Sequence, residues 1–161
     1  MRVHDIMSSD VVSCRSDTDL AQAAKLMWQG RLGSLPVVDP HGQVVGILTD
    51  RDIAMAVATR QRNATHIGVH EAMSTKVRHC FADDDAGVAL KQMEDGRVRR
   101  LPVLDAGLNL AGIVSIDDIV LHALDVDGGI PSADFVKALR RICALPALEP
   151  EVNFTETFVS G

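Results

Sequence analysis

The chain has 161 residues, 47% of them hydrophobic, which is enough to fill the core of one compact domain or of two very small, closely packed ones. Lysine and arginine number 16 against 22 acidic residues, and the formal net charge of −6 would repel a nucleic-acid backbone. Charged side chains interrupt the first 30 residues too often for a signal peptide or a membrane helix, and the three cysteines contain no CxxC pair. We therefore expect a cytoplasmic globular protein without disulfides that binds neither nucleic acid nor membrane.

The first third of the chain predicts a unit with the order strand, helix, strand, strand, helix. Its elements are a strand over 11–14, a helix that follows the capping cluster 16–18 and ends at Gly30, strands over 35–38 and 44–48, and a helix from about Asp50. The first helix is indicated by apolar residues at helical spacing, which are Leu20, Ala23, Ala24 and Met27. A turn at 40–42 joins the two longer strands.

The same pattern occurs again 66 residues further along the chain. Residues 3–53 align with residues 69–119 without a gap, and 21 of the 51 paired positions are identical, against roughly three for unrelated sequences. The identities include Met7 with Met73, Gly46 with Gly112, Asp52 with Asp118, and the triplet Leu-Pro-Val at 35–37 and 101–103. A unit of about 50 residues has too few apolar groups to bury its own faces, so the two copies should pack about a pseudo-twofold axis and leave a cleft for a ligand.

The second unit predicts the same elements, and the chain then continues beyond the repeat. Strands are expected over 77–80, 101–104 and 110–114, one helix carries the stripe Ala86, Ala89, Leu90 and Met93, and another starts near Asp117. A further helix begins at Ser132, and its apolar side is formed by Phe135, Val136, Leu139, Ile142 and Cys143. A loose tail follows, in which Phe154 and Phe158 can anchor to a neighbouring surface. The predicted division is repeat 1 at 1–60, a connector at 61–68, repeat 2 at 69–124, and a C-terminal helix and tail at 125–161.

Taken in order, an early Met-Ser pair, a capped helix, Leu-Pro-Val, and a strand reading GxxTxxD or GxxSxxD resemble the CBS domain, named after cystathionine β-synthase. The last motif stands at 46–52 and 112–118, and the resemblance covers roughly residues 1–124. It implies an α/β fold of two paired repeats, called a Bateman module, that binds AMP, ADP, ATP, S-adenosylmethionine or NADH in the cleft. It also implies a homodimer, because such modules often pair into a flat disc, and a regulated partner protein.

The resemblance further implies a set of nucleotide-binding residues: Thr49, Asp52, Ser115, Asp118, Ser13, His79 and Arg100. In each motif the aspartate would hold the ribose diol, because one carboxylate can accept hydrogen bonds from two hydroxyls. The Thr or Ser before it would contact phosphate at a helix start, where free backbone N–H groups attract anions. Ser13 and His79 would line the base pocket from the first strands, and Arg100 would meet phosphate.

Each of these features also has a structural interpretation. The motif residues are typical of helix caps and first-turn acids. A solvated or salt-bridged surface accounts equally well for the basic residues Arg51, Arg97, Arg99 and Arg100. The local cluster of His79, Cys80 and residues 83–85 is more typical of a buried strand position followed by a helix cap than of a metal site. We expect neither a metal nor a catalytic residue.

These observations favour a non-catalytic sensor of adenosine-type nucleotides, whose ligand changes the angle between the repeats and so affects a partner. The hypothesis requires no cofactor, since the nucleotide is the ligand itself. The alternative is a ligand-free dimerisation or docking module in which the C-terminal helix supplies the contact. An enzyme is the third hypothesis, and no activated nucleophile or acid–base pair supports it.

Overall fold

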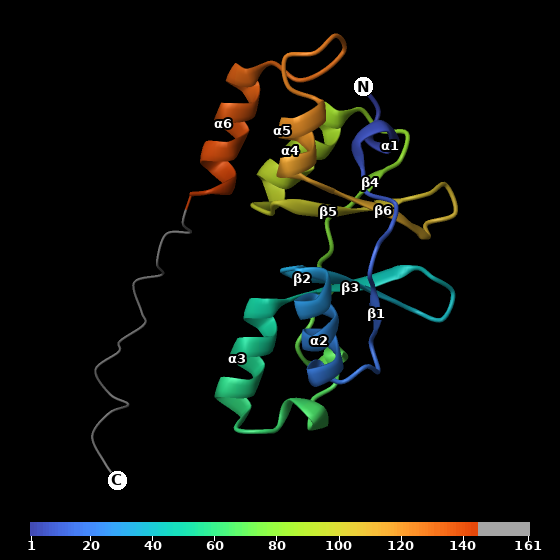
Figure 1. The fold of residues 1–161 in the computed structure, drawn as a ribbon, viewed down its shortest axis with the longest axis vertical. Coiled ribbons are helices and arrows are strands. Elements are labelled where there is room, and N and C mark those ends of the chain that lie inside the picture. The colour runs from blue at the N-terminus through green and yellow to red at the C-terminus, as the bar shows by residue number, and fades with distance from the viewer. Residues whose placement is uncertain (145–161) are drawn as a thin grey trace, which may run out of the picture.

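The structure, a computed structural model, describes residues 1–144, so the predicted tail anchors Phe154 and Phe158 lie outside the described residues. Two three-stranded sheets, one from each repeat, lie at the centre of the molecule, and the long helices lie on their outer sides (Figure 1). The α/β architecture predicted from the repeats is therefore confirmed.

The first repeat contains a short helix, a three-stranded sheet and two longer helices. Its elements are α1 (Val3–Ile6), β1 (Cys14–Arg15), α2 (Leu20–Gly30), β2 (Ser34–Val38), β3 (Val44–Thr49) and α3 (Asp50–Arg60). Strand β1 runs parallel to β2, and β2 runs antiparallel to β3, with Leu35 opposite Leu48. The prediction of a strand over 11–14 is wrong in its start, because only Cys14 and Arg15 find partners on β2.

The second repeat has the same order and follows two short 3₁₀ helices, η1 (Ala64–His66) and η2 (Val69–Glu71). Its elements are β4 (Cys80–Phe81), α4 (Ala86–Gly96), β5 (Arg100–Leu104), β6 (Leu110–Ser115) and α5 (Ile116–His122). The strand predicted over 77–80 also begins late, since β4 pairs with β5 only from Cys80 onward. The helix predicted after the repeat is α6 (Ser132–Ile142), which packs on α4.

Capping side chains and left-handed residues set the ends of the long helices. The N-cap of α2 is Asp19, one residue after the predicted cluster, and its carboxylate accepts a hydrogen bond from the backbone N–H of Gln22. Gly30 is the last helical residue of α2, but the left-handed conformation that ends the helix belongs to Arg31, with φ of 52°. Arg97 ends α4 in the same left-handed conformation, with φ of 50°.

Each repeat has its own hydrophobic core between its sheet and its helices. In the first core the side chains that are at most 4% exposed include Leu20, Ala23, Met27, Leu35, Val37 and Leu48. The second core contains their counterparts, of which none is more than 1% exposed: Ala86, Ala89, Met93, Leu101, Val103 and Val114. The predicted helix stripes therefore face these cores except at Ala24, which is only partly buried and lines a groove between α2 and α3. The predicted burial of Cys14 and Cys80 is confirmed.

The two repeats exchange their leading segments. Val3 and Ile6 of α1 lie in the core of the second repeat, while Ile67 and Val69 lie in the core of the first. Ile67 belongs to the predicted connector, residues 61–68, and it is fully buried. Each core is thus completed by a segment that precedes the other repeat.

A close contact between methionine and glycine follows each exchanged segment. A Cβ placed on Gly112 would lie 2.5 Å from the sulfur of Met7 and 3.0 Å from the backbone oxygen of Ser8. On Gly46 it would lie 2.5 Å from the sulfur of Met73. Real Cβ atoms do not approach other atoms this closely, which explains why glycine stands at both positions.

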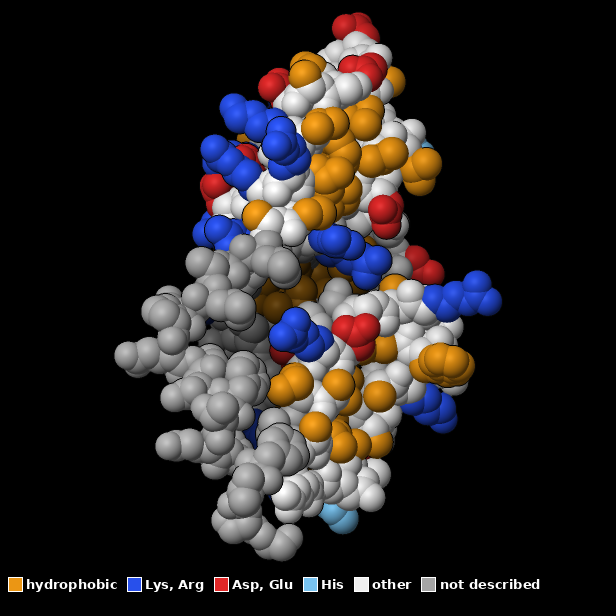
Figure 2. Space-filling view, turned by 90° about the vertical axis from the view of Figure 1, so that its left-hand side faces the viewer, with side chains coloured by type: hydrophobic (Ala, Val, Ile, Leu, Met, Phe, Trp, Pro, Cys, Tyr) orange, Lys and Arg blue, Asp and Glu red, His pale blue; other side chains and the backbone are white. Residues whose placement is uncertain are grey.

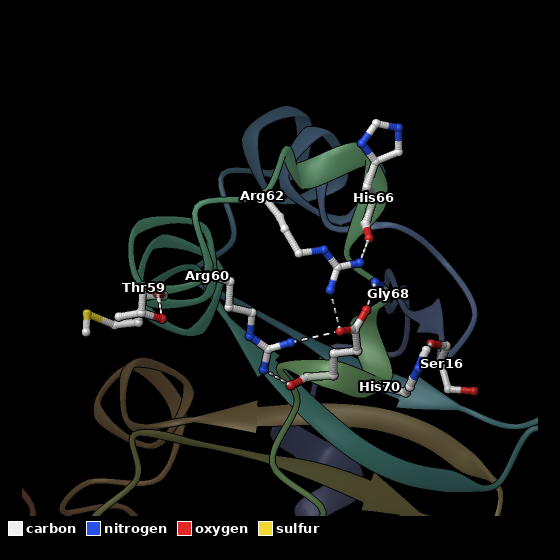
Figure 3. Close-up of polar contacts among 9 residues, drawn as sticks. Ser16, Thr59, Arg60, Arg62, His66, Gly68 and His70 are labelled. Carbon is white, nitrogen blue, oxygen red and sulfur yellow. Dashed lines mark hydrogen bonds and ion pairs between the residues drawn. The ribbon is translucent and has the colours of Figure 1, made fainter.

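The connector is held to α3 by Glu71, on which two arginines converge (Figure 3). Arg60 and Arg62 each donate to Glu71 Oε2 over 2.9 Å, and the backbone N–H of Gly68 donates to Oε1 over 2.9 Å. The hydrogen bonds from Gly68 and Arg62 lower the pKa of the Glu71 carboxyl below its usual 4.5. Arg62 also donates to the carbonyl oxygen of His66, so the segment around η1 is tied at both ends.

Helix α6 buries one face against the second repeat. Phe135, Ala138 and Ile142 are at most 7% exposed. The prediction that Phe135 and Ile142 lie on the apolar side of this helix is therefore confirmed. Val136 is 53% exposed and Cys143 is also exposed, so the prediction that these two lie on the apolar side is wrong. Ala138 lies in the core in their place.

Candidate ligand-binding cleft

The cleft between the two repeats contains two adjoining cavities. The larger, of about 780 Å³, is lined by residues of both repeats that include Thr49, Arg51 and Arg99. The smaller, of about 460 Å³, is lined by residues that include Ser115 and Asp118. Three residues line both: Ser34, Arg100 and Asp117. Figure 2 shows a hollow between the upper and lower halves of the molecule, with Lys and Arg side chains near its rims.

Both GxxTxxD-type motifs form capping boxes at a strand-to-helix junction. Ser115 Oγ donates to Asp118 Oδ2 over 2.6 Å, and the backbone N–H of Ser115 donates to the same oxygen over 2.8 Å. Thr49 makes the equivalent bonds to Asp52 Oδ2 over 2.7 and 2.9 Å. The prediction that these residues cap the starts of α3 and α5 is therefore confirmed. It uses one oxygen of each carboxylate, and Oδ1 of either aspartate has no hydrogen-bond donor among residues 1–144.

The cleft brings together four of the seven predicted site residues. Ser115, Asp118 and Arg100 line the smaller cavity, and Thr49 lines the larger cavity next to Arg100. Asp52 lines neither of these two cavities.

The two residues predicted to hold the base lie elsewhere. Ser13 lines neither cleft cavity, and Val11 and Val12 line the smaller one in its place. His79 lines a separate cavity of about 590 Å³ and packs edge to face on Phe81, with 5.5 Å between ring centroids. Both residues precede the strands on which they were placed, since β1 begins at Cys14 and β4 at Cys80, and their contact with a base stays a prediction.

Charges are distributed unequally over the two cavities. Asp10, Asp117 and Asp118 line the smaller cavity, where Arg100 is the one basic residue among those that the structure describes. The larger cavity has the three arginines Arg51, Arg99 and Arg100 against Asp50 and Asp117. An anionic group is therefore favoured in the larger cavity, and a neutral or cationic group in the smaller one.

The two repeats carry different side chains at positions that line the smaller cavity. Val12, which lines the smaller cavity, corresponds to Arg78, and Ser34 corresponds to Arg100. The Arg78 side chain lies across Gly96, so that a Cβ on Gly96 would be 2.6 Å from Arg78 Cδ. The Arg78 guanidinium donates a hydrogen bond to Gln92 Oε1 over 3.2 Å. Arg78 therefore packs on α4, whereas its counterpart Val12 lines the smaller cavity of the cleft.

The acidic cluster after His79 serves the backbone. Asp84 Oδ2 accepts a hydrogen bond from the N–H of Phe81, and Asp85 Oδ1 accepts one from Gly87 at the start of α4. Within residues 1–144, no group of three His, Cys, Asp or Glu side chains is placed to hold a metal ion. In the same part of the chain, no helix is long and apolar enough to cross a membrane.

Two exchanged α/β repeats with a ligand-sized cleft between them define the class of paired-repeat modules, and the comparisons identify the family. The CBS domain matches residues 3–59 and 69–125, so the chain belongs to the CBS domain family. It is 34% identical, over 92% of its length and 90% of the relative, to an uncharacterized 17.7 kDa protein of Acidianus ambivalens.

Solved structures and larger relatives place this module in context. The CBS domain pair of protein MJ0100, in complex with 5′-methylthioadenosine and S-adenosyl-L-methionine, superposes with a TM-score of 0.67 at 30% identity, over 75% of this chain and 94% of that one. Homoserine O-acetyltransferase of Methanococcoides burtonii is 36% identical over 117 residues, which are 73% of this chain but 23% of that enzyme. In that relative the matching region is a minor part of a longer protein.

Proposed function

We propose that this protein is a regulatory module that binds an adenosine-type ligand in the cleft, with the sugar at Ser115 and Asp118. The observation that carries the proposal is the 460 Å³ cavity in which the second motif and Arg100 meet. Its volume lies in the range of small-molecule sites. The ligands considered are AMP, ADP, ATP, NADH and S-adenosylmethionine.

The chemistry of the cavity suits a ribose ring. Asp118 Oδ2 already accepts two hydrogen bonds from Ser115, which orients the carboxylate, and Oδ1 remains available to a sugar hydroxyl. A carboxylate held in place by the protein loses little conformational entropy when it binds, so its hydrogen bonds contribute more to affinity. The capping box and the binding role are therefore compatible at this site.

Arg100 suits a phosphate that leaves the smaller cavity. It lines both cavities, and Arg51 and Arg99 lie beyond it in the larger one. A nucleotide with its ribose on Asp118 would extend its phosphates toward these arginines, where Coulomb attraction is favourable. Thr49 lines that same larger cavity and offers a hydroxyl.

The similar MJ0100 pair supports the adenosine class of ligand, since it binds 5′-methylthioadenosine and S-adenosyl-L-methionine. In our proposal the bound ligand changes the angle between the two repeats, and this change is passed to a regulated partner protein. A ligand shifts such an equilibrium only by its difference in affinity for the two shapes. We place the protein in the cytoplasm, acting as a sensor and not as an enzyme.

The proposal is tested by a thermal-shift panel of AMP, ADP, ATP, NADH, S-adenosylmethionine and 5′-methylthioadenosine, followed by calorimetric titration of any ligand that stabilises. A ligand at a hundred times its dissociation constant raises the free energy of unfolding by about 2.7 kcal/mol, which moves the melting temperature visibly. No stabilisation by any ligand at millimolar concentration would contradict the proposal.

The matched variants Asp118→Asn and Asp52→Asn assign the site. Asparagine still accepts the hydrogen bond from the backbone at the helix start, so the cap survives, while the ionised acceptor for the ribose is lost. We expect Asp118→Asn to weaken binding about tenfold and Asp52→Asn to change it little. Equal affinity in wild type and Asp118→Asn would refute the assignment of the ribose.

A second candidate function is a ligand-free docking module. The observation that favours it is the exposed face around Trp28, which is 85% exposed. The same panel discriminates between the candidates, because a docking module has no reason to be stabilised by nucleotides.

A further inference from the structure

The larger cavity of the cleft gathers positive charge in a molecule that is acidic as a whole. Arg51, Arg99 and Arg100 all line it, and we call it the arginine cavity. The formal net charge of the chain is −6. Within residues 1–144, none of the three guanidinium groups forms an ion pair. An acidic segment that reaches this cavity therefore meets three cationic hydrogen-bond donors.

Helix α6 ends beside the arginine cavity. Cys143 directly follows the helix, and Nη2 of Arg99 donates a hydrogen bond to its sulfur over 3.7 Å. In Figure 1 the C-terminal end of α6 reaches the level of β5, the strand that begins at Arg100. A chain extends by at most about 3.6 Å per residue, so Glu149, six positions after Cys143, lies within about 22 Å of this contact.

The segment that follows α6 carries only negative charge. Residues 145–161, which we call the acidic tail, include Glu149, Glu151 and Glu156 and contain no lysine, arginine or histidine. The tail is tethered to the cavity it complements, so its carboxylates are present there at an effective concentration on the order of millimolar. At such a concentration even weak ion pairs between exposed groups are populated.

We infer that the acidic tail docks its glutamates on Arg51, Arg99 and Arg100 and competes with the phosphate of a nucleotide for the arginine cavity. This inference rests on the proposed function, because it makes the tail a built-in competitor of the anionic part of the ligand. The sign of the charge and the place where the chain leaves α6 select this occupant.

Docking of the acidic tail makes the cleft selective. A ligand with phosphate groups has to displace the tail, so its apparent affinity falls by the fraction of chains in which the cavity is accessible. A neutral ligand confined to the smaller cavity does not meet the tail and keeps its full affinity. The tail therefore sets the concentration at which a phosphorylated nucleotide occupies the cleft.

The first test removes the charge of the tail in the full chain with the triple substitution Glu149→Gln, Glu151→Gln and Glu156→Gln. In calorimetric titrations the affinity for AMP should rise about threefold or more, because the competitor is weakened. The affinity for 5′-methylthioadenosine, which has no phosphate, should stay unchanged. An unchanged affinity for AMP in this variant would overturn the inference.

A charge-matched control separates local competition from a change in net charge. The substitutions Asp17→Asn, Asp83→Asn and Asp127→Asn also remove three negative charges, at exposed positions that line neither cleft cavity. This variant should bind AMP as wild type does, since screening limits the effect of distant charges. A gain in AMP affinity equal to that of the glutamine variant would also overturn the inference.

The second test detects the docked tail without any nucleotide. A nitroxide is attached to Thr155→Cys in a full chain that also carries Cys143→Ser, and the buried thiols of Cys14 and Cys80 do not react. The label should broaden the backbone amide signals around Arg99 in nuclear magnetic resonance spectra. The triple glutamine substitution should reduce this broadening, whereas the aspartate control should keep it.

The two tests have separate modes of failure. Charge-dependent broadening in a protein that binds no adenosine ligand would support the docked tail and contradict the proposed function. Binding of AMP without such broadening would leave the proposed function standing and overturn the inference. Broadening that is confined to surfaces outside the arginine cavity would overturn it as well, because the tail would then have another docking site.

Discussion

Gln43 and Asn109 form an isolated antiparallel bridge between the two repeats, and they hold the same position in their repeats. A residue that pairs with its own counterpart lies at the axis relating the two copies. Bridges away from the axis occur in exchanged pairs, since Ser8 pairs with Ile113 just as its counterpart Ser74 pairs with Ile47. The axis therefore runs past the turns of both hairpins, and each motif meets the leading segment of the other repeat.

The close packing of Gly112 at this exchanged contact leads to a prediction about stability. Gly112→Ala would force a Cβ to within 2.5 Å of the Met7 sulfur and 3.0 Å of the Ser8 backbone oxygen. Methionine can move, but the backbone of Ser8 is held by its bridge to Ile113. We expect a loss of about 1–3 kcal/mol in the free energy of unfolding, measured by urea denaturation.

Gly33→Ala is the matched control for this measurement. A Cβ at Gly33 would meet its nearest neighbours, Asp50 and Arg100, at 3.7 and 3.8 Å, which is ordinary contact. Its free energy of unfolding should stay within about 0.5 kcal/mol of wild type. If both alanine variants are equally stable, the exchanged contact at Gly112 is not tightly packed.

Most of the fold was readable from the sequence, because each position could be compared with its counterpart 66 residues away. Thr49 and Ser115 were recognised as helix starts from local chemistry alone, and capping depends on little else. Val11 and Val12 were misread as strand, since their apolar character reflects a place at the cleft and not pairing with β2. Pairing depends on distant residues, which local patterns do not contain.

The shape of the site was less predictable than its motifs. Arg100 was chosen on family resemblance, and it does line both cavities. The path of the Arg78 side chain over Gly96, at the position where the first repeat has Val12, depends on rotamers and close packing in three dimensions. No spacing rule in the sequence reports such a contact.

Arg100 gives a prediction that separates phosphate from nucleoside recognition. Arg100→Ser installs the residue that stands at the same position of the first repeat, Ser34. In the proposed pose it removes a charge-assisted hydrogen bond to phosphate, so affinity for AMP should fall about tenfold or more. Affinity for 5′-methylthioadenosine, which has no phosphate, should change little in the same calorimetric titration.

A charge-matched control is needed because removing any arginine changes the net charge. Arg140→Ser on the exposed side of α6 removes the same charge away from the cleft, and AMP affinity should be unaffected. Equal losses for AMP and 5′-methylthioadenosine in Arg100→Ser would mean that Arg100 shapes the cavity without contacting phosphate.

The three cysteines should differ in reactivity. Burial raises the pKa of the Cys14 thiol to about 11, and burial with the nearby Asp84 carboxylate raises that of Cys80 to about 12. Both are therefore protonated and shielded at pH 8, whereas Cys143 is exposed. Ellman's reagent should titrate one thiol per native chain and three in denaturant, and Cys143→Ser should abolish the native reaction. More than one fast thiol in the folded protein would contradict the buried position of Cys14 or Cys80.

Glu71 predicts how stability depends on pH. Its folded-state pKa is lowered below 4.5, so its ionised form stabilises the folded chain above that pH, and the contribution is lost as the pH falls through the lower, folded-state value. Glu71→Gln removes the charge that Arg60 and Arg62 contact. At pH 7 this variant should therefore melt at a lower temperature than wild type, and the gap should narrow as the pH is lowered past 4.5.

Arg62→Gln sharpens the same measurement, because the Arg62 hydrogen bond is one of the causes of the lowered pKa. This variant should lose part of the acid dependence, while the Gly68 backbone bond preserves the rest. High salt should reduce the pH 7 difference between Glu71→Gln and wild type, since these partly exposed ion pairs are screened. The contrary result is that the melting temperatures of Glu71→Gln and wild type fall in parallel from pH 7 to below pH 4. The Glu71 carboxyl would then have the same pKa in the folded and the unfolded chain. In that case the contacts of Glu71 that hold the connector to α3 are not electrostatic in origin.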